Sequence, residues 1–193
     1  MREIAKSICR LLALIAVSPL LLSYWCWSLI LGKDRALEGS SQTLSLLPGI
    51  IGVYLRRAFL MRILAHCDKT ATVEFGTLFS QTGARLDENV YVGPRCHLGL
   101  VHIERDALLG PGVHVPSGAR THGTADPSKP IREQEQARVL VRIGEGAWIG
   151  SGAVVMADVG AHSVVGAAAV VTKPLPERVL AAGVPAKVLK NRD

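Results

Sequence analysis

The stretch IGEGAWIGSGAVV, residues 143–155, carries the pattern that decides the fold. A large aliphatic residue recurs every six positions, at Ile143, Ile149 and Val155, and an alanine stands two positions before each of the last two. In an extended chain, residues two apart point to the same side. Each hexad therefore directs one small and one large side chain into a common interior, and a glycine-containing turn separates one pair from the next.

The six-residue step continues on both sides of this stretch. The other large apolar positions are Val73, Phe79, Leu86, Val92, Leu98, Ile103, Leu109, Val115, Val165 and Val171. This period indicates a parallel β-helix, in which each hexad forms a short strand and a turn and three hexads complete one coil. We expect a mainly β domain over residues 67–193 that ends in a short C-terminal tail or helix. One corner should be shortened, because Val155 and Val165 are only ten residues apart.

Composition concentrates the positive charge at the N-terminal end. The chain has 193 residues, 49% of them hydrophobic, and a formal net charge of +6. Residues 1–72 hold nine Lys and Arg against four Asp and Glu, whereas the remainder is nearly neutral. A basic N-terminal region on a neutral body indicates membrane phospholipid rather than nucleic acid as a partner, since no basic cluster accompanies aromatic residues in the repeat region. The four cysteines lack zinc-type spacing and are expected to be reduced thiols.

Residues 11–32 contain no charged side chain and are long enough to cross the hydrocarbon core of a bilayer. Tyr24, Trp25 and Trp27 are typical of an interfacial belt, and no small-residue cleavage site of a signal peptide follows them. Both flanks are basic, so the positive-inside rule gives no orientation. We favour a re-entrant hairpin bent near Pro19 with both ends on the cytoplasmic side, and a kinked single span is the alternative.

A second helix is expected after a break at EGSSQT, residues 38–43. Arg56, Arg57 and Arg62 stand among aliphatic and aromatic residues over about residues 44–64. This composition fits an amphipathic helix lying at the level of the lipid headgroups, and packing on the protein's own domain is the alternative. Residues 1–66 are thus predicted to be a membrane-associated helical region.

The repeat is interrupted by a polar stretch at residues 122–140. Such a long excursion from a compact β-helix is usually functional. The stretch begins at His122 and contains Lys129, Glu133 and two candidate substrate-binding residues, Asp126 and Arg132, whose side chains are able to contact a hydroxylated molecule.

Residues 143–155 and VVGAAAVVTKPLPERVLAAGVPAKVLK, residues 164–190, resemble the C-terminal signature of the hexapeptide-repeat acyltransferase family, which includes the galactoside and maltose O-acetyltransferases. The match is firm over residues 117–190, weaker from about residue 70, and absent before that. The resemblance implies a left-handed β-helix and a homotrimer with active sites between neighbouring subunits. It also implies acetyl-CoA or another acyl-CoA as co-substrate, with no metal ion.

The resemblance also assigns roles to residues by position. His122 takes the place of the general base, a role that suits a neutral imidazole near pH 7. Trp148 lies beside the path of the acceptor or the pantetheine. The remaining coenzyme-binding candidates are Ser151, Ala167, Thr172 and Lys173, which line the coenzyme A channel, and Lys187 and Lys190, which lie near the nucleotide phosphates. Pro174 and the Ala168–Ala169 pair depart from the usual residues of the family.

We therefore expect a membrane-associated O-acyltransferase, specifically an O-acetyltransferase, that modifies a saccharide or lipid-linked glycan during exopolysaccharide or surface-glycan assembly. Acetyl-CoA is cytosolic, so the protein should lie at the inner membrane with its β-helix facing the cytoplasm.

The repeat also predicts the direction of other side chains. Cys96 falls on an inward position, whereas His97, His102 and His114 point outward, and His97 and His114 should share a face. Two alternatives stay open: a zinc-dependent lyase of the γ-carbonic-anhydrase type that uses these outward histidines, and a non-catalytic trimeric scaffold.

Overall fold

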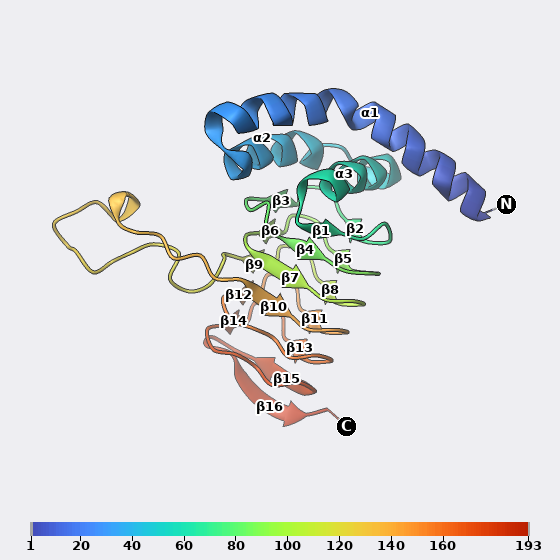
Figure 1. Cartoon of the computed structure of the whole chain (residues 1–193). Coiled ribbons are helices and arrows are strands. Elements are labelled where there is room, and N and C mark those ends of the chain that lie inside the picture. Colours follow the sequence, from blue (N-terminus) through green and yellow to red (C-terminus); the bar gives the residue numbers. More distant parts are fainter. Residues whose placement is uncertain (1, 193) are drawn as a thin grey trace.

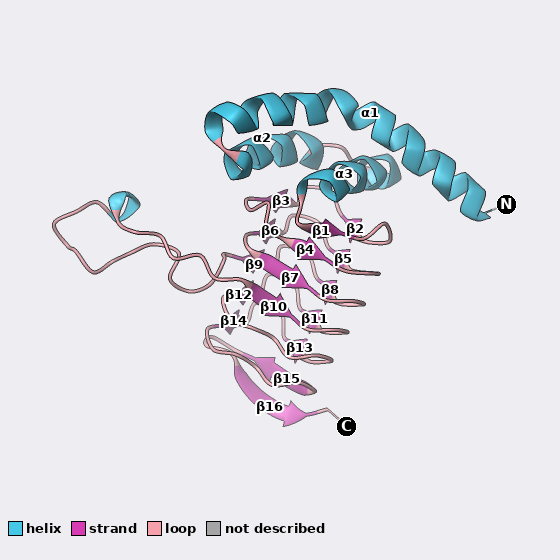
Figure 2. Ribbon diagram, viewed as in Figure 1, coloured by secondary structure: helices cyan, strands magenta, loops and turns pink. Residues whose placement is uncertain are grey.

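The computed structural model describes residues 2–192, which form three helices on one end of a three-sided parallel β-helix (Figure 1, Figure 2). The helices, together called the helical cap, are α1 (Arg2–Leu31), α2 (Lys33–Ser45) and α3 (Gly49–Ile63). The strands are β1 (His66–Cys67), β2 (Thr72–Val73), β3 (Leu78–Phe79), β4 (Arg85–Leu86), β5 (Tyr91–Val92), β6 (His97–Leu98), β7 (Val101–Ile103), β8 (Leu108–Leu109), β9 (His114–Val115), β10 (Val141–Ile143), β11 (Trp148–Ile149), β12 (Val154–Val155), β13 (Val164–Val165), β14 (Val170–Val171), β15 (Val179–Ala182) and β16 (Lys187–Asn191).

The strands stack into three sheets, one on each side of the β-helix. Sheet A has the order β1-β4-β7-β10, sheet B has β16-β15-β13-β11-β8-β5-β2, and sheet C has β14-β12-β9-β6-β3. All pairs except β15 with β16 are parallel, and from β1 to β15 successive strands along the chain belong to different sheets. The expected parallel β-helix is therefore confirmed.

The interior follows the predicted alternation of small and large residues. Ile149 is fully buried, as is Ala153, and Cys96 occupies an inward position with no exposure. Val159 lies four residues after Val155, is buried, and bridges Ile143 and Leu175 of neighbouring coils. Val159 thus takes the inward position at the expected shortened corner, and the six-residue spacing did not predict it.

The corners of successive coils stack closely. A Cβ atom on Gly150 would lie 2.5 Å from the backbone nitrogen of Ala167 in the next coil, a distance that side chains do not reach. Glycine at this corner is therefore a packing requirement, and it keeps the two coils at hydrogen-bonding distance, with the Ala168 N–H donating to the Ser151 carbonyl at 2.9 Å.

Helix α1 corrects the expected hairpin. It is one continuous helix with Pro19 inside it, and the chain reverses at Gly32, whose φ of 83° is left-handed. A proline removes one backbone hydrogen bond, and packing of α1 on α2 and α3 holds the rest of the helix together. By length and composition, Lys6–Leu31 is the one helix of the described chain that could cross a membrane.

The expected break at residues 38–43 is also wrong, because these residues lie inside α2. Serine is a weak helix former that competes for backbone groups. Here the hydroxyl groups bond within the structure: Ser40 donates to the Ala36 carbonyl at 3.0 Å, and Ser41 donates to the Phe79 carbonyl of β3 at 3.2 Å. Tertiary contact with the β-helix thus overrides the low helix propensity.

Helix α3 packs on the β-helix, which was the alternative to a helix lying among lipid headgroups. Arg56 is 2% exposed and donates to three carbonyls, those of Val73 (2.9 Å), Leu44 (3.1 Å) and Leu47 (2.6 Å). Arg57 is also buried and donates to the Ala71 carbonyl at 3.1 Å. Two of the three arginines thus join the helical cap to the first coil, and Arg62 is the exposed one.

Two further boundaries differ from expectation. The C-terminal tail is strand β16, antiparallel to β15, and not a helix. The polar excursion begins at residue 116, directly after β9, rather than at 122, and residues 116–140 are called the loop below. The loop projects from the side of the β-helix and carries one short 3₁₀ helix, Ile131–Glu133 (Figure 1).

Replacement of Arg56 should destabilise the protein strongly. The variant Arg56→Met removes the donors of three carbonyls in a buried place, which costs about 3 kcal/mol of unfolding free energy. Chemical denaturation followed by circular dichroism measures the change. Arg62→Met is the matched control, since it makes the same substitution at an exposed position of α3 and should shift stability by less than about 0.5 kcal/mol. Equal effects of the two variants would contradict the role assigned to Arg56.

Candidate active site

His122 lies in a groove of about 510 Å³ that runs down the outer face of sheet C from α2 to the base of the loop. We call it the His122 groove. Its wall includes Glu38, Ser41 and Gln42 of α2, the ends of β3, β6 and β9, and the loop residues Thr121, His122, Gln136 and Arg138. The groove therefore joins three parts of the chain that are far apart in sequence.

Two histidines form part of the groove wall below α2. His97 of β6 and His114 of β9 are register partners, and their rings stack at 5.0 Å between centroids with an angle of 10°. The expectation that these two residues share a face is confirmed. Burial, and then the neighbouring imidazole of His114, lower the pKa of His97. His97 thus favours its neutral form, which donates and accepts hydrogen bonds.

The base of the loop is held by backbone contacts on both sides of His122. The Ser117 side chain, which is buried, accepts from the Leu100 N–H at 2.7 Å, and its carbonyl accepts from the Val139 N–H at 2.9 Å. The Gly123 N–H donates to the Glu135 carbonyl at 2.8 Å. The two arms of the loop are therefore paired, and His122 sits between the two pairing points with an exposed side chain.

Asp34, in the first turn of α2, links the helical cap to the loop. Its carboxylate accepts from the backbone N–H and the hydroxyl of Thr82, both at 2.8 Å, and it forms an ion pair with Arg138 at 3.9 Å. Asp34 and the α2 residues of the groove were not predicted from the sequence. They sit in a segment with no resemblance to known motifs, so only the three-dimensional contact reveals them.

The loop residues Asp126 and Arg132 are not brought into the His122 groove of their own chain. Asp126 accepts hydrogen bonds from Ser128, which lower the pKa of its carboxyl group, and it lies 3.5 Å from Lys129. Arg132 pairs with Glu133 at 3.6 Å. Both residues lie in the projecting part of the loop (Figure 1), and their substrate-binding role stays a prediction.

The coenzyme-binding candidates lie along sheet C and sheet B. Ser151 and Ala167 occupy the stacked corner before sheet C, and Thr172 and Lys173 directly follow β14 at the corner beyond it. Trp148 is 53% exposed on the outer face of sheet B, as expected. Lys187 and Lys190 belong to β16 at the far end of sheet B. Sheet C, which carries His97 and His114, thus lies between the two pairs of corner candidates.

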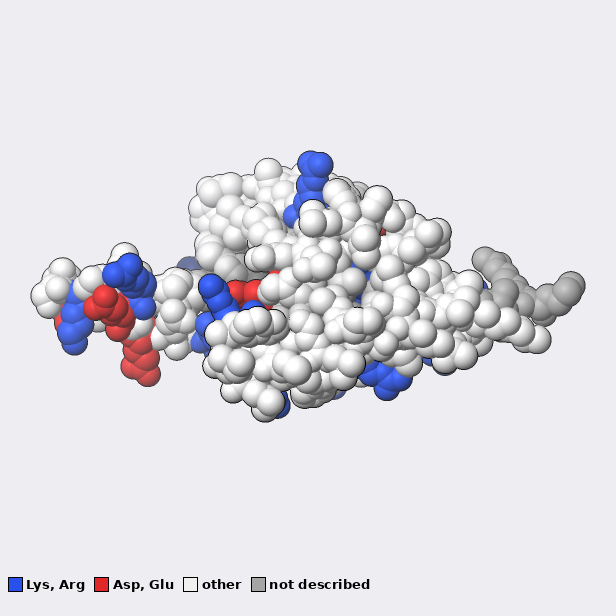
Figure 3. Space-filling model, turned by 90° about the horizontal axis from the view of Figure 1, so that it is seen from above, with Lys and Arg blue, Asp and Glu red and all other residues white. Residues whose placement is uncertain are grey.

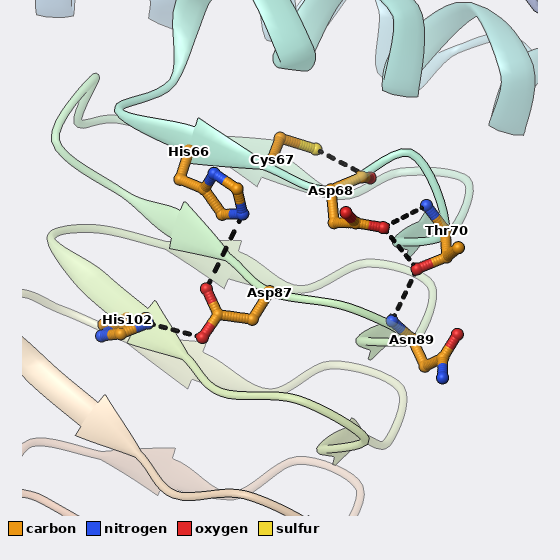
Figure 4. A network of polar contacts seen from close by, with 7 residues as sticks. All are labelled: His66, Cys67, Asp68, Thr70, Asp87, Asn89 and His102. Atoms are coloured by element: carbon orange, nitrogen blue, oxygen red, sulfur yellow. Dashed lines mark hydrogen bonds and ion pairs between the residues drawn. The ribbon is translucent and has the colours of Figure 1, made fainter.

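The third outward histidine, His102, lies on a different side of the β-helix. It belongs to sheet A, where its Nε2 atom is 2.9 Å from Asp87, and His66 approaches the other oxygen of Asp87 at 3.9 Å (Figure 4). Within residues 2–192, no three His, Cys, Asp or Glu side chains form a group that could hold a metal ion. The histidines of the zinc alternative therefore do not converge within one chain.

The cysteines offer no evident nucleophile on the β-helix. Cys67 and Cys96 are free and buried, and burial raises the pKa of the Cys96 thiol to about 11. A thiol of this kind stays protonated near pH 7 and is a poor nucleophile. The role of His122 as general base stays a prediction.

Comparisons with known proteins agree with this fold. No family model matches the chain. Over 158 residues, it is 28% identical to the galactoside O-acetyltransferase of Escherichia coli (strain K12), which covers 71% of this chain and 78% of that protein. It is 29% identical over 164 residues to WbbJ of the same strain, provisionally named a lipopolysaccharide biosynthesis O-acetyl transferase, covering 72% of this chain and 82% of that protein.

Solved structures show the same fold at lower identity. A maltose O-acetyltransferase from Clostridium difficile 630 superposes with a TM-score of 0.69 at 20% identity, covering 83% of this chain and 88% of that one. A galactoside acetyltransferase in complex with coenzyme A gives a TM-score of 0.61 at 24% identity, with 85% and 84% covered. The similarity thus extends beyond the repeat into part of the helical cap.

The pKa of His97 should depend on the neighbouring imidazole of His114. In the variant His114→Gln, the pKa of His97 should rise, because the neighbouring positive charge is lost while part of the burial remains. NMR titration of the imidazole resonances measures this, and His162→Gln, a histidine outside the groove, serves as control. An unchanged pKa of His97 in His114→Gln would contradict this dependence.

Because unfolding restores the ordinary pKa of about 6.5, His97 binds more protons when the protein is unfolded. Acidification through that pH range should therefore lower the stability of the wild type.

Proposed function

We propose that the chain, which resembles the hexapeptide-repeat acetyltransferases in sequence and in fold, transfers an acyl group from acyl-CoA to a hydroxyl group of a saccharide or lipid-linked glycan. The acyl group is acetyl in this proposal, in keeping with the names of the relatives and with solved neighbours that hold coenzyme A or acetyl-CoA. The observation that carries the proposal is the placement of His122 in an open groove whose wall also contains polar side chains of α2 and the His97–His114 pair.

The proposed reaction is direct transfer with His122 as general base. The acceptor hydroxyl attacks the thioester carbonyl carbon while a ring nitrogen of His122 takes the hydroxyl proton. The C–S bond then breaks, and the coenzyme A sulfur leaves with the proton returned from the imidazolium. The products are the acylated acceptor and free coenzyme A. A neutral imidazole suits both steps near pH 7.

The neighbouring side chains of the groove support binding of a sugar. His97, His114, Ser41 and Gln42 present hydrogen-bonding groups along one wall, and Glu38 and Arg138 add charges of both signs. Such a mixture suits hydroxyl groups, which donate and accept. Loop residues Asp126 and Arg132 would complete the acceptor site of a neighbouring subunit in a homotrimer, because they project away from the groove of their own chain.

Membrane association is part of the proposal. The N-terminal helix is long and apolar, and the basic residues concentrate in the first 72 positions. We place the protein at the cytoplasmic face of the inner membrane, where acetyl-CoA is available. The relative WbbJ, with its lipopolysaccharide name, supports a role in surface-glycan assembly.

Loss of His122 should abolish most of the activity. The variant His122→Ala should lower the turnover number by about 10²- to 10⁴-fold, the scale of a lost general base, with coenzyme A affinity nearly unchanged. Release of coenzyme A from acetyl-CoA, measured with a thiol reagent in the presence of a glycan acceptor, gives the rate, and calorimetry gives the affinity. The control is His102→Gln on sheet A, which should retain activity. Full activity of His122→Ala would refute the proposed mechanism, and failure of the wild-type chain to bind coenzyme A would favour a non-catalytic scaffold.

The basic strand β16 should contribute to coenzyme binding. The double variant Lys187→Gln/Lys190→Gln should weaken coenzyme A binding by roughly 10-fold, because two phosphate partners are lost. The affinity for pantetheine, which lacks the nucleotide and its phosphates, should be unaffected. This control separates the loss of a phosphate contact from a general loss of fold. A coenzyme A affinity equal to that of the wild type would remove both lysines from the site.

A further inference from the structure

Helix α1 has two different faces along its length. Ala13, Val17 and Tyr24 are buried against α2 and α3. The opposite face is a stripe of large apolar residues at steps of three, four or seven residues, each more than half exposed: Ile4, Ile8, Leu11, Ile15, Leu22, Trp25 and Leu29. Packing against α2 and α3 explains why the first face is apolar, but it does not explain the apolar residues of the exposed face. A contiguous exposed stripe of this length marks an interaction surface.

The apolar surface continues onto the neighbouring segments of the helical cap. Leu46 in the α2–α3 connection and Ile50 and Ile51 at the start of α3 are all more than two-thirds exposed. Seen from above, this end of the molecule shows few charged side chains, whereas charges of both signs gather on the projecting loop (Figure 3). Between α1 and α3 runs an apolar groove of about 320 Å³, lined by Cys9, Leu12, Ala13, Ala16, Ile50, Ile51, Tyr54 and Leu55.

An arginine pocket of about 170 Å³ lies on the other side of α1 from this apolar groove, and Tyr54 of α3 lines both. Leu11 lines the pocket and belongs to the exposed stripe of α1. Arg10 of α1 and Arg57 and Arg62 of α3 line the pocket, and none of the described residues that line it is acidic. The Arg57 guanidinium lies 4.6 Å from the Tyr54 ring centre and uses one nitrogen for the Ala71 carbonyl.

Arg10 carries the evidence that the pocket is built for a ligand. Its Nε atom is buried and has no hydrogen-bond partner among the residues that the structure describes. A buried guanidinium donor without a partner is costly. Three positive groups from two helices, with no carboxylate among them, therefore call for an anion that is supplied from outside the chain.

We propose that the arginine pocket binds an anionic phospholipid of the membrane, with its phosphate against Arg10, Arg57 and Arg62 and its acyl chains along the exposed apolar stripe of α1, to which Leu11 of the pocket also belongs. Guanidinium groups are suited to phosphate oxygens, which they contact in a bidentate manner. The ligand needs a negative head directly beside an apolar tail, and a phospholipid has both.

In this arrangement α1 lies in the plane of one leaflet and does not cross the bilayer. Crossing would pull Val17 and Tyr24 away from α2 and α3, whose apolar contacts belong to the same core as the β-helix. An interfacial helix of this kind buries its apolar face at the boundary of headgroups and acyl chains. The proposal rests on the membrane association of the proposed function but not on the chemistry at His122, because the arginine pocket and the His122 groove share no lining residue. In Figure 1 the N-terminal end of α1 points away from the loop.

Vesicle flotation of the full chain tests the proposal. The purified protein is mixed with vesicles of phosphatidylcholine alone, or of equal parts phosphatidylcholine and phosphatidylglycerol, and the bound fraction is measured over a range of lipid concentrations. The wild type should bind the anionic vesicles more tightly. The double variant Arg10→Gln/Arg62→Gln should lose roughly 25-fold in affinity for them, about fivefold for each arginine. Arg57 is left intact because it also joins α3 to the β-helix.

The control variant is Arg85→Gln/Arg120→Gln, which removes the same charge from exposed positions outside the helical cap and should bind as the wild type does. Circular dichroism checks that both variants are folded. If both double variants lost the same affinity for anionic vesicles, overall charge would explain the binding and the arginine site would be refuted. Equal affinity of the wild type for both kinds of vesicle would also refute it. The variant His122→Ala should bind vesicles as the wild type does, and its loss of acyl transfer would leave the lipid site supported. A wild-type protein that transfers the acyl group but does not bind the anionic vesicles would refute the lipid site and leave the proposed function in place.

Discussion

The open end of the β-helix is the constraint on which the other features of this protein depend. The first coil would expose apolar side chains and unpaired carbonyls unless something covered it. Phe59 and Leu60 of α3 supply the apolar cover, and Arg56 donates to carbonyls of both the cap and β2. An arginine is needed there because its planar group of donors reaches several acceptors at once. The position of α2, and therefore one wall of the His122 groove, follows from this closure.

The β-helix could be predicted from the sequence because its period is short and its side-chain rule is local. Every hexad repeats the same small and large inward positions, so Ile149 and Ala153 are recognised without any knowledge of distant contacts. The helical cap could not be predicted in this way. Its shape depends on where Ser41 meets β3 and on how neighbouring helices hold α1 around Pro19, and neither contact has a signature within its own segment.

The same difference holds for the candidate site: residues in the repeat region could be predicted from the sequence, and those in the helical cap could not. The outward register of His97 and His114 follows from the repeat, and the role of His122 stays a prediction from the family resemblance. That these three histidines line one groove was not predicted. Asp34 and Glu38 were missed because they lie in α2, which the sequence presents as a break followed by a basic helix. Asp34 binds Thr82 and pairs with Arg138, so one carboxylate positions both a corner of the β-helix and an arm of the loop. This link explains how the cap and the loop come to share one groove.

The layering of the cap also relates the proposed membrane face to the groove. In Figure 1, α1 forms the outermost layer and α2 lies beneath it, between α1 and sheet C. A helix with its side chains is about 10–12 Å across, so the α2 wall of the groove lies roughly one helix diameter below the surface that would meet the lipid. The headgroup layer of a bilayer is itself about 5–7 Å thick on each side. A sugar joined to a lipid by a diphosphate would therefore reach the groove without leaving the membrane. A freely diffusing acceptor would gain nothing from this placement, which is why the proposed function includes a lipid-linked glycan as acceptor.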